Sequence, residues 1–290
     1  MKESLHLLEY LLMRGSVELV NALPRSLALK TARGLGELFY NVPRVKRVTE
    51  ENLKFTGFPP SVGKESFKNF LACAADFLRL KTYTFQELKE LFLPVDPSVV
   101  PREGGILLTA HIGNWELMGA LFSKLSGGRL SVVAKPMKNK RVDRLINGIR
   151  QKWGVKVIPT GRGIEIIREL KKKRFVGILL DQRPKVKEGV LTTFLGRKTY
   201  TNKGAALISV KTGKPVIPAF CFAEGERYRI EVYEPIYPQN RSVEELTQLY
   251  TEAIERAVRK HPEQWFWFHR RWKNSPEFKE WKGEKVPQRS

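Results

Sequence analysis

The residues with the clearest capacity for acid–base chemistry are His111 and Glu116, which lie five positions apart in the segment AHIGNWE. A carboxylate that accepts a hydrogen bond from one imidazole nitrogen fixes the tautomer and leaves the other nitrogen free to act as a base. On one regular helix two residues at this spacing would point about 140° apart, so they converge only across a turn. Gly113 permits such a turn, and Asn114 is a candidate N-cap of the following helix. We therefore predict that His111, oriented by Glu116, takes a proton from a hydroxyl group.

A second interpretation of the same two residues stays open. In it His111 ends the preceding strand and Glu116 is a first-turn acid stabilised by the helix dipole. The sequence has no G-x-S-x-G motif, so attack by a substrate hydroxyl is simpler than a covalent enzyme intermediate. The two cysteines form no C-x-x-C pair and no three ligating side chains have metal-site spacing, so we predict neither a metal site nor a cofactor.

The elements that must position these residues follow from the spacing of apolar side chains. Residues 1–92 show mostly helical spacing and end before a Pro-containing stretch, Pro94–Pro101. From residue 105 strands alternate with helices, which indicates an α/β fold with a mainly parallel central sheet flanked by helices. We predict a helical N-terminal portion, 1–92, that packs on the body and the membrane surface, and an α/β domain, 93–290. The predicted strands are 106–110, 130–134, 155–159, 175–180, 216–222 and 228–233; the predicted helices are 114–125, 140–153, 164–172, 202–212 and one after Ser242; a long polar loop is predicted at 181–200.

The charge of the chain favours anionic partners. Lysines and arginines outnumber acidic residues by 52 to 30, a formal net charge of +22. Residues Arg129–Arg174 hold 15 basic and 3 acidic residues, a net charge of +12. A solvated helical face accounts for Lys171–Arg174 but not for the whole cluster. Nucleic-acid binding would need aromatic stacking surfaces or a recognition helix, and the cluster has few aromatic residues, so we predict no nucleic-acid partner.

No segment of the sequence is apolar enough to predict a membrane span. The longest run without a charged residue, Gly104–Trp115, has 12 residues, against roughly 20 needed to cross a bilayer. The first twenty residues are apolar but interrupted by Glu9, Arg14 and Glu18, and they do not resemble a signal peptide. Two interpretations stay open for them: an amphipathic helix in the membrane interface, or a helix packed on the body of the protein.

An ordered set of motifs resembles one known family. The segment AHIGNWE resembles the H-x4-D/E motif of the lysophospholipid acyltransferase superfamily, in the form found in bacterial lipid A biosynthesis acyltransferases. Further segments resemble motifs of the same family and follow in the expected order. They are Arg47–Leu53, Lys135-Pro136 with Asn139, Arg150 and Gly154, Asp181-Gln182-Arg183, Phe194–Gly196 with Thr201 and Gly204, Pro215–Pro218, and Gln264–Arg271. Lys135 departs from the pattern, because the family usually has arginine there.

The resemblance implies a glycerol-phosphate-acyltransferase-like fold and an O-acyltransferase. The implied reaction moves a fatty acyl chain from acyl carrier protein or acyl-CoA to a hydroxyl of a lipid A precursor, an anionic glycolipid, in lipopolysaccharide biosynthesis. His111 would be the general base and Glu116 its orienting carboxylate. The implied location is the cytoplasmic face of the inner membrane, with peripheral or N-terminal attachment. The implied substrate-binding residues are Asn114, Lys135, Arg150, Asp181, Gln182, Arg183, Gly196 and Thr201.

Several alternatives stay open. Arg150 and Arg183 either contact a phosphate or the thioester, or are structural ion-pair partners, for instance Arg183 of Asp181. The acceptor is alternatively another glycolipid, a lysophospholipid or an aminolipid. A third hypothesis, less favoured, is a non-catalytic basic protein that binds anionic membrane or nucleic acid. The sequence predicts neither the acyl chain length nor the acylated hydroxyl nor the oligomeric state.

Overall fold

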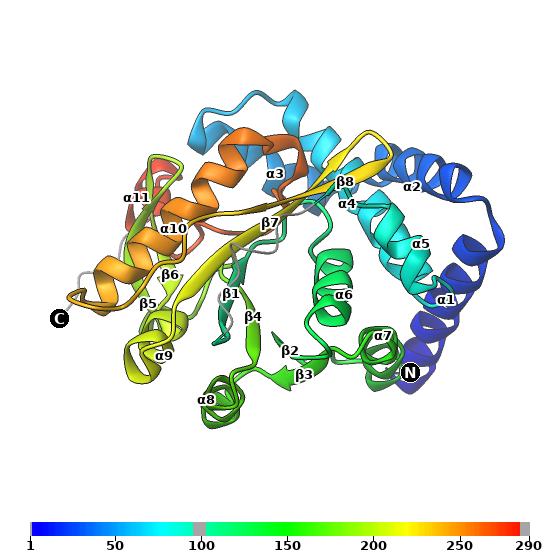
Figure 1. The fold of residues 1–290 in the computed structure, drawn as a ribbon. Helices are drawn as coiled ribbons and strands as arrows, with labels where there is room; N and C mark the ends of the chain where they lie inside the picture. Colours follow the sequence, from blue (N-terminus) through cyan, green and yellow to red (C-terminus); the bar gives the residue numbers. More distant parts are fainter. Residues whose placement is uncertain (1, 95–102, 285–290) are drawn as a thin grey trace.

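The computed structural model describes residues 2–94 and 103–284. In the part of the chain that the structure describes, five helices precede the first strand, and strands then alternate with helices (Figure 1). The first helices are α1 (Lys2–Ala22), α2 (Arg25–Phe39), α3 (Pro43–Thr56), α4 (Ser61–Arg79) and α5 (Phe85–Glu90). The following elements are β1 (Gly105–Thr109), α6 (Trp115–Leu125), β2 (Leu130–Ala134), α7 (Lys140–Lys152), β3 (Lys156–Pro159), α8 (Gly163–Lys171), β4 (Phe175–Leu179), η2 (Val186–Glu188), β5 (Gly189–Phe194), β6 (Arg197–Asn202), α9 (Gly204–Thr212), β7 (Val216–Glu224), β8 (Arg227–Val232), α10 (Val243–Lys260), η3 (Pro262–Gln264) and α11 (Pro276–Trp281).

The central sheet has six strands in the order β3-β2-β4-β1-β7-β8. All neighbouring pairs are parallel except β7 and β8, which are antiparallel. The predicted α/β fold with a mainly parallel, helix-flanked sheet is therefore confirmed. Strand β1 lies between β4 and β7, and all five of its residues are buried, as expected for a parallel strand covered on both faces.

Alternation along β1 divides the apolar core between the two faces of the sheet. Ile106 and Leu108 pack in a cluster with residues of α8, α9 and α10. Leu107, between them, packs in a second cluster with residues of α6 and α7. This division follows from the period of two residues in a strand. Figure 1 shows the two layers, with α1 beside α7 and α5 beside α6 on the second face.

The polar loop predicted at 181–200 is wrong, because most of this segment forms a β-hairpin. Strands β5 and β6 are antiparallel, and the two residues of their turn, Leu195 and Gly196, have φ of 52° and 76°. Positive φ at both positions is the geometry of the two-residue turn that best matches strand twist. The segment is polar, but its threonines are β-branched, and β-branched residues favour strands. Two of the hydroxyls meet inside the hairpin, with Thr192 Oγ1 2.7 Å from Thr201 Oγ1, and Thr199 Oγ1 donates to the carbonyl of Arg271 at 3.2 Å.

The N-terminal helices contact the last part of the chain. Asn52 in α3 donates hydrogen bonds to the carbonyls of Trp267 (2.7 Å) and His269 (2.8 Å). Asn69 in α4 donates to the carbonyl of Glu263 at 2.7 Å. These bonds hold residues 263–269 between the helical portion and the sheet. The division at residues 92 and 93 stays a prediction. Within the described residues, no helix is both long and apolar enough to cross a bilayer.

Candidate active site

His111 and Asp181 meet at the carboxyl edge of the sheet. Each lies two residues beyond the last residue of its strand, β1 or β4, and those last residues, Thr109 and Leu179, are partners in the parallel register. The two side chains therefore stand next to each other, at the edge where parallel sheets carry their sites. His111 Nδ1 lies 2.8 Å from Asp181 Oδ1. The imidazole is 22% exposed and the carboxylate only 1%.

Three donors hold the Asp181 carboxylate. Besides the imidazole, the backbone N–H of His111 donates to Oδ2 at 3.0 Å, and the indole N–H of Trp265 donates to the same oxygen at 2.9 Å. Burial by itself raises the pKa of Asp181, but the positive charge of His111 and these three hydrogen bonds outweigh it and lower the pKa to about 2. Asp181 is thus ionised near neutral pH, so Nδ1 carries the shared proton and Nε2 is the basic nitrogen.

Aromatic rings and one amide surround the imidazole. The rings of Trp115 and Phe266 lie 5.0 and 5.7 Å from that of His111, centroid to centroid. Gln182 Nε2 lies 3.3 Å from His111 Nε2. Since Gln182 is exposed and the imidazole partly so, an acceptor hydroxyl can replace the amide at Nε2.

The predicted contact between Glu116 and the imidazole is wrong, because Glu116 pairs with Arg150. Arg150 donates from Nε to Glu116 Oε2 at 3.0 Å and from Nη2 to Oε1, and it also binds Asn147 Oδ1 at 2.9 Å. Glu116 lies in the first turn of α6 and reaches across to α7, away from the end of β1. Of the two roles left open for Arg150, a substrate contact or a structural ion pair, its contacts in the structure are those of an ion pair. Burial lowers the pKa of Arg150, but the bond to Glu116 outweighs it and raises that pKa, so the guanidinium stays charged.

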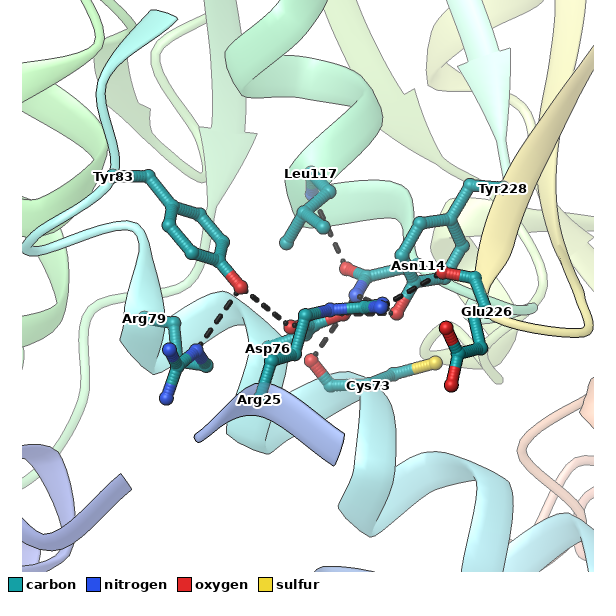
Figure 2. A network of polar contacts seen from close by, with 9 residues as sticks. All are labelled: Arg25, Cys73, Asp76, Arg79, Tyr83, Asn114, Leu117, Glu226 and Tyr228. Carbon is teal, nitrogen blue, oxygen red and sulfur yellow. Dashed lines mark hydrogen bonds and ion pairs between the residues drawn. The ribbon is translucent and has the colours of Figure 1, made fainter. Parts of the chain in front are cut away.

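Asn114 is occupied by structural hydrogen bonds, as Figure 2 shows. Its side-chain oxygen caps α6 by accepting from the N–H of Leu117 at 3.2 Å, and its amide donates to Cys73 O and Tyr228 Oη, both at 3.2 Å. The side chain is buried, so it has no surface to offer a substrate. The predicted N-cap is confirmed, whereas the substrate contact predicted for Asn114 has no support in this geometry.

The Asn114 bonds continue into a buried polar network centred on Asp76 of α4 (Figure 2). Asp76 Oδ2 accepts hydrogen bonds from Arg25 Nη2 and Tyr228 Oη, both 2.6 Å long, and a longer one from Arg25 Nε at 3.2 Å. Tyr83 Oη donates to Oδ1 at 3.1 Å. The network connects α2, α4 and β8 to the turn that carries His111.

A large apolar cavity opens beside His111. Its volume is about 1240 Å³, and it lies between the sheet and α6 and α7. His111, Glu116, Lys135, Arg150 and Gln182 contribute to its lining. Most of the remaining wall is apolar and includes Leu107, Leu121, Phe122, Leu130, Val132 and Phe175. The cavity therefore combines a basic nitrogen with a long apolar compartment.

The other predicted binding residues lie apart from this cavity. Arg183 donates to Asn274 Oδ1 at 2.7 Å, and no described contact joins it to Asp181, so the ion pair suggested between them is wrong. Gly196 is in the β5–β6 turn. Thr201 is fully buried and accepts from Arg271 Nη2 at 2.6 Å. Gly196 and Thr201 thus serve the structure of the hairpin and its neighbours. Substrate contacts of Lys135, Arg150 and Gln182 stay predictions. Among the described residues no cluster of three or more His, Cys, Asp or Glu side chains could hold a metal ion.

The role of Asp181 as the partner of His111 was not predicted from the sequence. The available signal was its position directly after a predicted strand, which a parallel sheet places beside the end of β1. Nor was Trp265 predicted as a donor to Asp181. Trp265 and its neighbour Trp267 are both buried.

The comparisons with known proteins agree with this geometry. The sequence model of the bacterial lipid A biosynthesis acyltransferase family matches residues 1–274. The chain belongs to this family. The resemblance predicted from the motifs is thereby confirmed, and the family is one of acyltransferases.

Two mycobacterial proteins are similar to this member of the family. A phosphatidylinositol mannoside acyltransferase of Mycobacterium tuberculosis is 25% identical over 182 residues, 61% of this chain and 57% of its own. The protein of that name from Mycolicibacterium smegmatis is 24% identical over 173 residues, 58% of this chain and 57% of its own. The chain thus spans 57% of the length of these curated relatives.

Proposed function

We propose that this protein transfers a fatty acyl chain from a thioester donor to a hydroxyl of a phosphorylated glycolipid, with His111 as the general base. The observation that carries this proposal is the His111–Asp181 pair beside an apolar cavity that His111 lines. The pair can deprotonate a hydroxyl, and the cavity can receive an acyl chain. Family membership supports the reaction class.

The proposed acyl transfer needs no cofactor, because His111 and the two substrates account for every proton and bond. His111 Nε2 accepts the proton of the acceptor hydroxyl as its oxygen attacks the thioester carbonyl. The ionised Asp181 stabilises the imidazolium that forms, and Asp181 itself stays ionised. The carbon–sulfur bond then breaks, the new ester is left, and the imidazolium returns the proton to the leaving thiolate. Acyl carrier protein or acyl-CoA supplies the thioester.

Cationic side chains at the cavity suit anionic substrates. Lys135 and Arg150 line it together with His111, and Lys89 and Arg129 lie elsewhere along its wall. Glu116 holds the Arg150 guanidinium at this wall through two hydrogen bonds. We propose that Arg150 and Lys135 bind phosphate groups of the acceptor or the donor, since charge-assisted hydrogen bonds to phosphate are strong.

We propose attachment to the cytoplasmic face of the inner membrane through α1 and α2. Leu5, Leu8, Leu12 and Leu19 recur at helical spacing on α1, and each is more than half exposed. Leu27, Leu35 and Leu38 add exposed apolar area on α2. Exposed leucines at this density are typical of a helix lying in a membrane interface.

Sedimentation with vesicles tests this attachment. We expect the wild-type protein to sediment with vesicles of phosphatidylethanolamine and phosphatidylglycerol, and a Leu5→Ser, Leu12→Ser variant to stay in the supernatant. A matched variant, Leu125→Ser, removes an exposed leucine from α6 instead. Equal sedimentation of the two variants would contradict attachment through α1.

The acceptor favoured by the family is a lipid A precursor, and the relatives named for phosphatidylinositol mannoside support another glycolipid as the alternative. Both acceptors carry phosphate and sugar hydroxyls. The test is an acylation assay with lauroyl-acyl carrier protein or lauroyl-CoA and, in parallel, a tetra-acylated lipid A precursor, phosphatidylinositol mannoside and lysophosphatidylglycerol.

Mass spectrometry should show one added lauroyl group on a glycolipid. Product on lysophosphatidylglycerol alone would contradict the glycolipid acceptor. Absence of product on all three acceptors, together with salt-sensitive binding to DNA, would favour the non-catalytic hypothesis.

A further inference from the structure

The chain after α10 runs across the edge of the sheet where β1 and β4 end. Gly113 N–H donates to the carbonyl of Gln264 at 3.0 Å, and Phe266 N–H donates to the carbonyl of His111 at 3.0 Å. Ile112 and Trp265 thereby form an antiparallel bridge. The segment Gln264–Phe266 is therefore fixed against the turn that carries His111.

Trp265 is the residue of this segment that reaches the catalytic pair. Its indole N–H donates to Asp181 Oδ2 at 2.9 Å, and its side chain is 1% exposed. The ring packs among Phe194, Trp267 and Trp272, with centroid distances of 5.4, 4.8 and 6.1 Å. Ser66 of α4 donates a hydrogen bond to the Trp265 carbonyl. Both the backbone and the ring are held, so the indole N–H is a preorganised donor.

We infer that Trp265 is a positioning residue of the acyl transfer: its indole N–H holds Oδ2 of Asp181 so that Oδ1 faces His111 Nδ1. This inference rests on the proposed function, in which His111 is the base. Without the indole, Oδ2 keeps a single donor, the backbone N–H of His111. The carboxylate then rotates more freely, and the charge that it presents to the imidazole is less neutralised by hydrogen bonds.

A substitution of Trp265 leaves the other ionisable side chains near Asp181 in place. His269 and Arg271 lie close enough to Asp181 to interact with it through their charges, and Arg183 interacts in the same way with His269, but no described hydrogen bond joins any of the three to the carboxylate. Burial lowers the pKa of His269 to about 4 against the attraction of Asp181, so this imidazole is neutral above pH 6. Arg271 is held by Tyr200 O and Thr201 Oγ1.

The test compares Trp265→Phe with Trp272→Phe. Trp272 is 0% exposed and belongs to the same aromatic cluster, but its indole nitrogen has no hydrogen-bond partner within the described residues. Both substitutions remove the same ring volume from one core, and only the first removes a hydrogen bond to Asp181. A merely structural role predicts equal effects.

We expect Trp265→Phe to lower kcat about tenfold, as for the loss of one charge-assisted hydrogen bond. KM should change little, because Trp265 does not line the cavity. The ascending limb of the kcat/KM–pH profile should move to higher pH, because an Asp181 carboxylate with one hydrogen bond fewer favours the protonated imidazole. Trp272→Phe should keep the wild-type kcat and the wild-type position of the ascending limb.

A second variant covers the case in which Trp265→Phe fails to fold. Trp265→3-benzothienylalanine keeps the ring shape and replaces only the N–H by sulfur, and the same changes in kcat and pH limb are expected. Wild-type kcat and an unmoved limb in the folded variant would overturn the inference. So would equal changes in the Trp272→Phe variant.

The variant His111→Ala separates this inference from the proposed function. If His111→Ala is inactive and Trp265→Phe behaves as Trp272→Phe, the inference fails and the base assignment stands. If His111→Ala keeps near-normal activity, the base assignment fails instead.

Discussion

Asp181 Oδ1 lies 2.8 Å from His111 Nδ1, although 70 residues separate the two along the chain. The parallel pairing of β1 with β4 makes this possible, because it aligns the ends of the two strands. Glu116, five positions from His111, is held by Arg150 instead. The carboxylate that orients the base is thus supplied by the neighbouring strand of the sheet and not by the helix after His111.

The first prediction concerns Asp181→Asn. An amide oxygen can still accept from the imidazole, but it carries no charge to stabilise an imidazolium. We expect kcat to fall by at least about a hundredfold, in the range for lost acid–base catalysis, with KM changed little. Steady-state kinetics at pH 7 measure this. A loss of less than about threefold would contradict the pairing as a catalytic device.

The depressed pKa of Asp181 also predicts an acid dependence of stability. The carboxyl has a pKa of about 2 in the folded protein against an ordinary 3.8, so its contribution is present above pH 4 and is lost as the pH falls toward 2. A shift of this size corresponds to roughly 2 kcal/mol in the free energy of unfolding. Denaturant titrations between pH 2 and 6 should show a weaker acid dependence in Asp181→Asn than in the wild type.

Glu116 and Arg150 should behave as one unit. Since Glu116 acts by holding Arg150 at the cavity wall, Glu116→Gln and Arg150→Gln should raise KM for a phosphorylated substrate by similar factors. The double variant should be no worse than either single variant, because residues in one network are not additive. A shift of the pH profile in Glu116→Gln alone would instead indicate direct contact with the imidazole.

The cavity predicts a control of acyl chain length at Gly119 of α6. This glycine lines the cavity, and a Cβ atom built on it would come no closer than 3.8 Å to Leu130. Gly119→Leu therefore fits locally but occupies cavity volume, and we expect a shift toward shorter acyl donors in competition assays with mixed chain lengths.

Gly148 of α7 offers a matched control, because it is exposed and a Cβ atom there meets nothing within 4 Å. Gly148→Leu should keep the wild-type preference. An unchanged preference in Gly119→Leu would place the acyl chain outside this cavity.

The buried network around Asp76 predicts a loss of stability. Asp76→Asn leaves Arg25, itself only 19% exposed, without a counter-ion and weakens the bond to Tyr228. We expect a loss of about 3 kcal/mol in the free energy of unfolding, measured with denaturant. Glu65→Gln removes a half-exposed partner of Arg33 and should cost less than about 1 kcal/mol. Equal costs would contradict a structural role for the Asp76 network.

Much of the fold was predictable because the apolar pattern is strong. The strand predicted at 130–134 has its predicted bounds, the strand predicted at 216–222 extends two residues further, and the helix predicted after Ser242 begins at Val243. Ser242 and Glu245 form a capping box at the start of this helix. The hairpin β5–β6 was missed because its threonines are polar, and their burial depends on hydrogen bonds to each other that no local pattern shows.

The site was predictable only in part, for a physical reason. His111 is marked by its position after a strand, which is local information. Its partner depends on which strand lies beside β1, and the strand order of a sheet is not encoded in spacing. The donor Trp265 comes from still further along the chain. The cavity is likewise formed by elements distant in sequence, from Phe77 to Val232.

The rate of acyl transfer by His111→Ala tests the central claim most directly. His261→Ala is the matched control, because His261 lies at the end of α10 and does not line the cavity. With circular dichroism showing both variants folded, we predict that His111→Ala loses at least about a hundredfold in kcat while His261→Ala stays near the wild type. Near-wild-type turnover by His111→Ala would contradict the account.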